Sequence, residues 1–133
     1  MIRYLLDTNI LSDLLRNPLG AVRQRVALLN EDEIGSSIIV AAELRYGAAR
    51  RGSPRLTRAV EGMLQRMTIL SFDRPADEIY GELRASLEAS GTPVGSHDCL
   101  IAAHALAVGC ILVTANERDF TRVAGLKVEN WLR

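Results

Sequence analysis

The sequence predicts a single α/β domain over residues 1–133, with a parallel sheet of about five strands and helices on both faces. Two observations lead to this prediction. Short apolar runs alternate with helical segments along the whole chain, and 133 residues match the usual length of one domain. In such folds ligands bind beyond the carboxyl ends of the strands, so polar residues directly after strands are the first candidates for a site.

Composition narrows the class of protein. The chain is 48% hydrophobic, and its 16 basic and 16 acidic residues cancel to a net charge of zero, which excludes a disordered chain. The longest apolar run, Ile38 to Ala42, is far shorter than the ~20 residues that a membrane helix needs. The apolar start of the chain meets Asp7 at once and has no signal-peptide core, so we expect a cytoplasmic protein with no membrane association.

The first elements are a strand and two helices. Ile2 to Leu6 is a short apolar run, and Thr8 or Asn9 after it suits the cap of a helix that carries Leu11, Leu14 and Leu15. Pro18 begins a second helix, which ends at the acidic turn Glu31–Glu33.

Two further units follow. Ile34 to Ser36 reads as a strand, and Ser36 or Ser37 is expected to cap a helix that stops at Gly52. Pro54 lies in the first turn of the next helix, and Ile69–Leu70 forms the third strand.

The last third of the chain repeats the alternation. Pro75 opens a helix that ends near Gly91, and Ser96 is expected to cap a helix so apolar that it must be largely buried, up to Gly109. Cys110 to Thr114 and Lys127 to Glu129 are the last two strands. Cys99 and Cys110 have no metal-binding spacing, so we interpret both as small core residues.

Three carboxylates lie where packing does not explain them. Asp7 ends the first strand, whereas Glu43 and Asp98 lie in helices that are apolar on several sides. Glu43 and Asp98 have no basic residue three or four positions away, so local ion pairing does not account for them. Asp119 follows the fourth strand as well, although Arg122 is placed to pair with it. Asn116 is a candidate to cap a short helix or to orient a carboxylate or a water.

If these acids converge, they require a counter-charge. Two carboxylates about 4 Å apart repel by ~4 kcal/mol at an effective dielectric constant near 20. Oxygen ligands favour Mg²⁺ or Mn²⁺, whereas zinc prefers His or Cys. Such a cation lowers the pKa of a bound water and offsets charge at a phosphodiester, so the pattern predicts metal-assisted phosphodiester hydrolysis. No serine-nucleophile or phosphate-loop motif competes with this prediction.

The two histidines do not form a metal site by themselves. His97 and His104 lie about two helical turns apart, too far to chelate one ion. We interpret His104 as a hydrogen-bonded, partly buried helix residue, and His97 as a residue of the helix start, next to Asp98.

The arginines are segregated. Fifteen of the basic residues are arginine, and five fall between Glu43 and Glu61 with no acid among them: Arg45, Arg50, Arg51, Arg55 and Arg58. Guanidinium groups bind phosphate or carboxylate bidentately, so this run suits an RNA backbone or an acidic partner peptide. A solvated helix face remains an equal alternative.

Four blocks of the chain resemble the PIN-domain nucleases and, within them, the VapC toxins of bacterial VapBC toxin–antitoxin pairs. The blocks are Leu5–Leu11, Ala42–Ala48, Gly91–Ala105 and Val113–Phe120. The resemblance spans the chain and implies one PIN domain with a five-stranded parallel sheet. The chain differs from residues that are frequent in the family at Ser96-His97 and at Ala115. These differences leave the acids unchanged and bear on which RNA is preferred.

The resemblance also implies a function. It implies a Mg²⁺- or Mn²⁺-dependent endoribonuclease that cuts structured RNA such as tRNA, is neutralised by a VapB-type antitoxin, and forms a homodimer and toxin–antitoxin hetero-oligomers. Asp7 and Asp98 match direct metal ligands, and Glu43 and Asp119 match acids that act through water or hold a second ion. The polar residues expected to support them are Thr8, Asn9, Thr114 and Asn116. A PIN-type nuclease in RNA processing, or one acting on other nucleic acid, and a non-catalytic interaction module are the alternatives.

Overall fold

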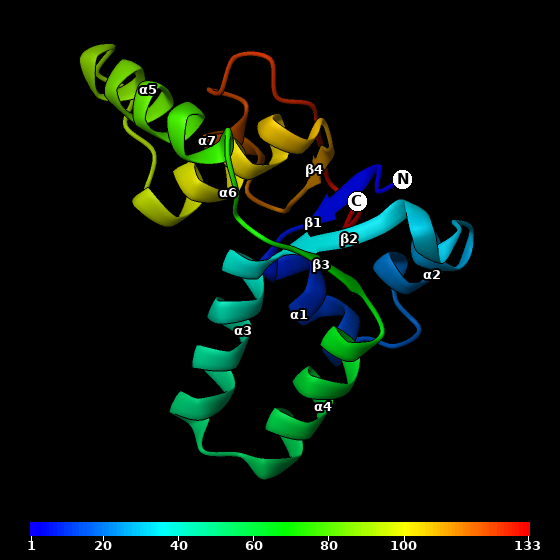
Figure 1. The fold of residues 1–133 in the computed structure, drawn as a ribbon. Coiled ribbons are helices and arrows are strands. Elements are labelled where there is room, and N and C mark those ends of the chain that lie inside the picture. The colour runs from blue at the N-terminus through cyan, green and yellow to red at the C-terminus, as the bar shows by residue number, and fades with distance from the viewer.

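The computed structural model describes all residues from Met1 to Arg133 and contains one five-stranded sheet (Figure 1). All of its strand pairs are parallel, and the strand order is β3-β2-β1-β4-β5. The strands are β1 (Tyr4–Leu6), β2 (Ile34–Ser37), β3 (Thr68–Leu70), β4 (Ile111–Val113) and β5 (Val128–Glu129). The predicted fold class and all five predicted strands are confirmed, and most of the observed strands are shorter than the apolar runs that predicted them.

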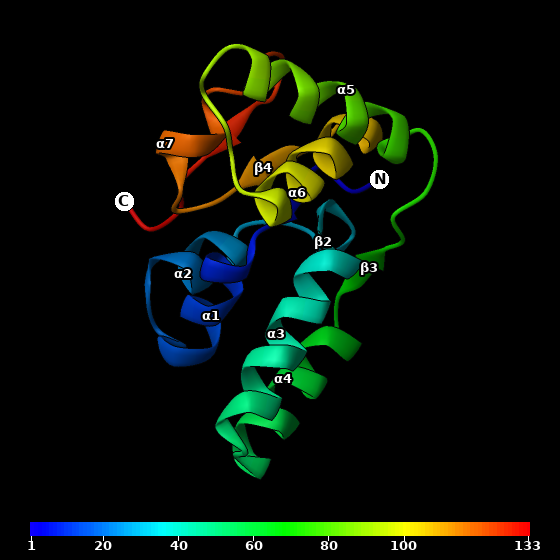
Figure 2. The same ribbon diagram turned by 90° about the vertical axis from the view of Figure 1, so that its left-hand side faces the viewer.

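Helices cover both faces of this sheet. They are α1 (Thr8–Arg16), α2 (Ala21–Ala27), α3 (Ile38–Arg51), α4 (Pro54–Gln65), α5 (Ala76–Ala89), α6 (Ser96–Val108) and α7 (Glu117–Phe120), with a short 3₁₀ turn, η1 (Glu31–Glu33). Figures 1 and 2 show α5 and α6 on one side of the sheet and α1, α3 and α4 on the other. The helices α3 and α4 pair with each other and project beyond the sheet (Figure 2).

The strand order places a topological switch point between β1 and β4. The chain moves outward from β1 through β2 to β3, then crosses back to β4 on the other side of β1. Right-handed crossovers on opposite sides of a strand place their helices on opposite faces, which opens a crevice beyond the carboxyl ends of the two central strands. Asp7 follows β1 directly, and Thr114 follows β4 directly.

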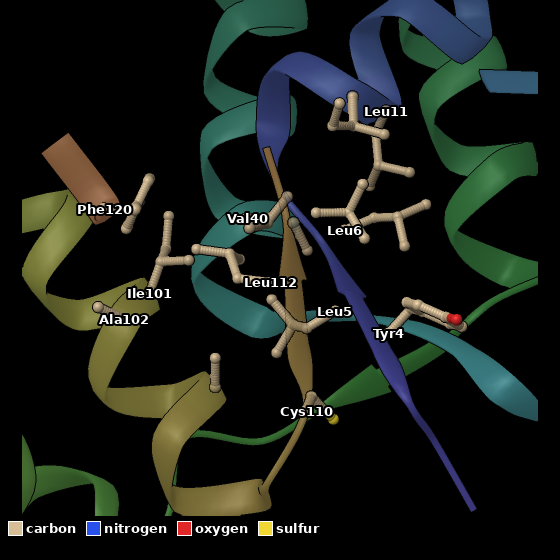
Figure 3. Close-up of a cluster of buried hydrophobic side chains, with 14 of the residues drawn as sticks. Tyr4, Leu5, Leu6, Leu11, Val40, Ile101, Ala102, Cys110, Leu112 and Phe120 are labelled. Carbon is tan, nitrogen blue, oxygen red and sulfur yellow. The ribbon is translucent and has the colours of Figure 1, made fainter. Parts of the chain in front are cut away.

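The core lies on both faces of the two central strands. Leu5 of β1 is in register with Leu112 of β4, and both side chains are fully buried. Figure 3 shows these two side chains directed toward Ile101 on α6, whereas Leu6 points to the opposite face, toward Leu11. This alternation is the two-residue period of a strand, and burial on both faces explains why the strands read as continuous apolar runs.

Helix ends follow the predicted signals in most places and depart from them at three helices. Pro18 does not begin α2, because it lies in a turn; α2 starts at Ala21 after Gly20 and ends at Ala27, short of the acidic turn. Ser37 caps α3, and Gly52 and Gly109 end α3 and α6 in the left-handed conformation that glycine adopts without strain. Asp7, not Thr8 or Asn9, caps α1, because its carboxylate accepts the Thr8 amide N–H. Gly95, not Ser96, occupies the cap position of α6, which has no side-chain cap.

The cysteines and the helix lengths agree with the composition argument. Cys99 and Cys110 are both free and buried, which confirms their interpretation as core residues. None of the helices is both long and apolar enough to cross a bilayer.

Candidate metal centre

The four predicted acids meet at the crevice between β1 and β4, although they come from four different elements. Asp7 follows β1, Glu43 lies in the second turn of α3, Asp98 lies in the first turn of α6, and Asp119 lies in α7. Asp7, Glu43 and Asp119 all lie near enough to Asp98 to raise its pKa. Residues 112 positions apart in the chain thus share one site.

Asp7 and Glu43 are tied together by Thr8. The Thr8 amide N–H donates to Asp7 Oδ1 at 2.7 Å, and the Thr8 hydroxyl donates to Glu43 Oε2 at 2.7 Å. Asp7 is only 4% exposed, because it is both the cap of α1 and the end of a central strand. One residue at a helix start therefore sets the separation of two carboxylates from different layers of the fold.

Thr114 holds the other oxygen of Asp7. Its hydroxyl is fully buried and donates to Asp7 Oδ2 at 2.8 Å, while the Asn116 backbone N–H donates to Thr114 Oγ1 at 3.0 Å. Asn9 closes the other side, because its Oδ1 accepts the Ala115 N–H at 2.9 Å and its Nδ2 lies 3.4 Å from Thr114 Oγ1. The loops after β1 and β4 are thereby joined by side chains.

Asn116 bridges the remaining two acids. Its Nδ2 lies 3.1 Å from both Asp98 Oδ2 and Asp119 Oδ2, so one neutral amide donates to two carboxylates. Asn116 occupies the cap position of α7, but its side chain makes no cap hydrogen bond. Of its two predicted roles, capping a helix and orienting a carboxylate, the structure therefore shows the second. All four predicted supporting residues, Thr8, Asn9, Thr114 and Asn116, contact an acid of this cluster.

An arginine and a histidine lie at the edge of the cluster. Arg122 Nη1 is 3.6 Å from Asp119 Oδ1. Asp119 therefore pairs with Arg122, as its sequence position suggested, and also belongs to the acid cluster. His97 Nδ1 lies 3.8 Å from Glu43 Oε1, although its side chain is largely exposed. His97 therefore borders the site.

The cluster holds more negative charge than its neighbours offset. The pKa of Asp98 is raised to about 6, first by burial and then by the negative charges of Asp7, Asp119 and Glu43. Burial also raises the pKa of Asp7, although hydrogen bonds from Thr114 and Thr8 oppose this. Both shifts have the direction expected for carboxylates that are gathered without a counter-ion.

The donor chemistry of the cluster fits a hard divalent cation. The atoms that the cluster offers to a cation are carboxylate and hydroxyl oxygens, and burial and then the other three acids disfavour the charged form of Asp98. No three acidic, histidine or cysteine side chains lie close enough together to form a complete metal cage. Mg²⁺ does not require such a cage, because it keeps several waters and binds one or two carboxylates.

The five arginines of the predicted run do not act as one surface. Arg45 on α3 pairs with Glu61 on α4. Glu61, the acid that follows the arginine run in the sequence, therefore offsets the charge of the first arginine of that run. The other four form no ion pair.

Two of those four line different hollows. Arg51 lines a groove of about 240 Å³ that begins at Thr8 and Glu43 and runs between α1, α3 and α4. Arg58 lines a cavity of about 820 Å³ between α1, α2 and α4, which contains none of the four acids.

Sequence reasoning missed several residues. Ser12 and Arg16 line the groove, and the signal was their spacing, since Thr8, Ser12 and Arg16 recur every four residues along one face of α1. His104 was expected to be partly buried and is only 1% exposed, in contact with Ser37. No local pattern predicts that pair, because its members are 67 residues apart.

The comparisons with known proteins agree with this site and fold. The family model "PIN domain" matches residues 4–126. The chain is 40% identical over 132 residues to the tRNA(fMet)-specific endonuclease VapC of Shigella flexneri, a match that covers 98% of this chain and 99% of that protein. It is 39% identical over 134 residues to ribonuclease VapC2 of Haemophilus influenzae, covering 99% of this chain and all of that protein.

Solved structures show the same architecture. The DNA-bound VapBC structure from Salmonella typhimurium contains a chain with a TM-score of 0.92 and 38% identity, with 98% of this chain and 99% of that chain covered. VapBC2 from Rickettsia felis, bound to a DNA fragment from its promoter, contains a chain with a TM-score of 0.88 and 36% identity, with the same coverage.

The crowding of charge makes a prediction about stability. Because the pKa of Asp98 is raised to about 6, the stability that its protonated form contributes is present at low pH and is lost as the pH rises through that value. We expect Asp98→Asn to raise the free energy of unfolding at pH 7.5 by about 1–2 kcal/mol, a figure reduced from the full shift because the side chain is partly exposed. Thermal and denaturant unfolding without divalent cations measures this.

Asp77→Asn is the matched control, because Asp77 also lies in the first turn of a helix but is exposed and remote from the cluster. We expect this variant to lose a few tenths of a kcal/mol, the value of an acid near a helix N-terminus. Mg²⁺ should raise the melting temperature of the unmodified chain and of Asp77→Asn but not of Asp98→Asn. Equal destabilisation of both variants would contradict the proposed repulsion.

Proposed function

The chain belongs to the PIN-domain family and, within it, to the VapC ribonucleases, and on this basis we propose that it is the toxin of a VapBC-type toxin–antitoxin pair. It acts as an endoribonuclease that hydrolyses phosphodiester bonds of structured RNA in the cytoplasm. Transfer RNA is the proposed substrate, because the Shigella flexneri relative is named for it. The observation that carries the proposal is the convergence of Asp7, Glu43, Asp98 and Asp119 at the switch point.

We assign the metal as Mg²⁺ or Mn²⁺. PIN-domain nucleases in general use divalent metal ions, and the all-oxygen donor set of this chain suits these two. Asp7 and Asp98 are the proposed direct ligands, and Glu43 and Asp119 act through water or hold a second ion. When bound, the cation supplies an activated water and charge stabilisation at the phosphorus.

The protein's own contribution is the fixed geometry of the acids. Thr8 and Thr114 each donate to Asp7, and Asn116 donates to Asp98 and Asp119, so each of these three carboxylates keeps one orientation. These donors are neutral and leave the negative charge of the cluster for the cation and the substrate. The conformations are therefore set before RNA arrives, which lowers the reorganisation needed at the reaction.

The partner of the chain is a VapB-type antitoxin. Solved relatives are VapBC assemblies, some with DNA, and we propose the same toxin–antitoxin hetero-oligomer here, built on a homodimer. The cavity of about 820 Å³ offers leucine and methionine side chains, and three arginines against one acid, Glu31, are among its lining residues: Arg23, Arg58 and Arg66. An antitoxin segment with apolar and acidic side chains fits this lining, so we assign Arg58 to the antitoxin.

The RNA backbone is assigned to the groove that begins at Glu43. Arg16 and Arg51 each lie eight residues beyond Thr8 and Glu43, respectively, in the groove lining. Eight residues span about 12 Å of helix, so two guanidinium groups flank the groove a short distance from the acids. Neither arginine has an ion-pair partner, which leaves both free for phosphate.

Cleavage by the isolated chain tests the activity. We expect the antitoxin-free chain to cut transfer RNA with Mg²⁺ or Mn²⁺, and to lose this activity with EDTA or in Asp7→Asn. Gel analysis of cleaved RNA measures it, and Asp77→Asn is the control for loss of a carboxylate outside the site. Equal cleavage by the unmodified chain and Asp7→Asn would show that the acids are not the active site.

Growth of bacteria tests the toxin role. Expression of the unmodified chain should arrest growth, and co-expression of the cognate antitoxin should restore it. Asp98→Asn should not arrest growth. If the chain cuts RNA in vitro but has no effect on growth, it is a nuclease of RNA processing and not a toxin.

The arginine assignment predicts a difference between two arginines of one helix. In an Asp7→Asn background without metal, Arg51→Ala should weaken RNA binding and lower the salt dependence of log Kd by about one unit, the value of one lost phosphate contact. Arg45→Ala removes the same charge from a paired guanidinium and should leave the salt dependence unchanged. If Arg51→Ala weakens antitoxin binding instead, the groove belongs to the antitoxin.

A further inference from the structure

His104 is a buried polar residue that none of the four acids contacts. It lies in α6, six residues after Asp98, and its side chain is 1% exposed. Its Nδ1 lies 2.7 Å from Ser37 Oγ, and its Nε2 is buried without a hydrogen-bond partner. The contact with Ser37 is therefore the one side-chain hydrogen bond of this buried ring.

Ser37 is the start of the helix that carries Glu43. It is the N-cap of α3, where its Oγ accepts the Ile39 N–H at 3.0 Å, and it is fully buried at the end of β2. Glu43 lies six residues further along α3. The His104–Ser37 contact therefore joins the helix of Asp98 to the cap of the helix of Glu43, one to two turns from each acid.

The contact is directional, unlike the packing around it. Apolar side chains such as Val40 and Ile101 fill the space between these layers, and apolar contacts tolerate small sliding motions. A hydrogen bond of 2.7 Å permits only a narrow range of distances and angles. Phe72 packs edge-on against the imidazole ring at 5.4 Å and restricts its rotation.

The environment of the ring favours its neutral form. Burial lowers the pKa of His104 and outweighs the Ser71 backbone and the Asp73 carboxylate, which raise it, so the contact with Ser37 is a bond between uncharged groups and adds no charge near the acids. The link therefore differs from Arg122 and His97, which approach the acids directly.

We propose that His104 is a positioning residue, which sets the separation of Asp98 and Glu43 by linking α6 to the Ser37 cap of α3. It does not touch the metal or the RNA. This inference rests on the proposed metal centre, and it adds a residue that acts through the helix framework.

Three substitutions at His104 separate the link from the volume of the ring. The amide of Asn reaches the position of Nδ1, whereas the amide of Gln reaches the position of Nε2. Phe keeps the ring and removes both nitrogens. We expect His104→Asn to preserve the contact with Ser37, and His104→Gln and His104→Phe to lose it.

The measurement is Mn²⁺ affinity by calorimetry on the full chain without RNA. We expect Mn²⁺ to bind at least tenfold more weakly to His104→Gln and His104→Phe, the usual effect of losing an outer-shell support, and nearly normally to His104→Asn. Val22→Ala is the control for lost stability, because Val22 is fully buried in α2, away from the link. Melting temperatures are measured for every variant.

The outcomes distinguish this inference from the proposed function. If Mn²⁺ affinity follows melting temperature across Val22→Ala and all His104 variants, or if His104→Asn binds as weakly as His104→Gln, His104 is only a core residue and the inference fails. Asp98→Asn, measured in the same series, should abolish Mn²⁺ binding. If Asp98→Asn binds Mn²⁺ normally, the proposed centre is wrong and the inference falls with it.

Discussion

The repulsion among four carboxylates at one edge of the sheet is the constraint on which the rest of the structure depends. Asp7, Glu43, Asp98 and Asp119 are held together by neutral donors, chiefly Thr8, Thr114 and Asn116, which orient the carboxylates without cancelling their charge. Arg122 reaches only the edge of the cluster, at Asp119, and no other lysine or arginine pairs with these four acids, so most of the negative charge is left to attract a cation. Burial first, and then the charges of the neighbouring carboxylates, raise the pKa of Asp98 to about 6, so the fold gives up stability at neutral pH to keep this group charged in the crevice.

The scaffold is rigid where the site needs support. The central strands β1 and β4 contain fully buried leucines on both faces, and Asp7 and Thr114 follow them directly. Side chains on short loops after such strands move little, because the strands are packed from both sides. Asp119 is on the four-residue helix α7 and depends instead on Asn116, which anchors it to Asp98 across the crevice. The position of Asp7 is thus fixed by the sheet, whereas the position of Asp119 is fixed by the side-chain amide of Asn116.

Acidic and basic residues occupy different parts of the surface, which the net charge of zero does not reveal. A total of zero argues against an RNA-binding surface, yet acids gather at the crevice while unpaired arginines line the groove and the cavity beside it. The structure also shows that the run of five arginines is not one binding surface. Arg45 is neutralised by Glu61, and Arg16, outside the predicted run, joins Arg51 in the groove. Helix pairing decides which charges remain free, since residues 16 apart in the chain become neighbours when α4 folds back on α3.

The sequence by itself determined the alternation of strands and helices and the class of sheet, because periodicity is a local signal. It also predicted the four acids as site residues, from polar residues after strands and from acids in apolar helices without a local ion-pair partner. It misassigned the caps of α1 and α6, where several neighbouring residues were chemically able to cap. Only the tertiary structure decided that Asn116 bridges Asp98 and Asp119, that Glu61 neutralises Arg45, and that His104 meets Ser37. These contacts depend on how helices and loops from separate parts of the chain are placed in space, and no local pattern carries that information.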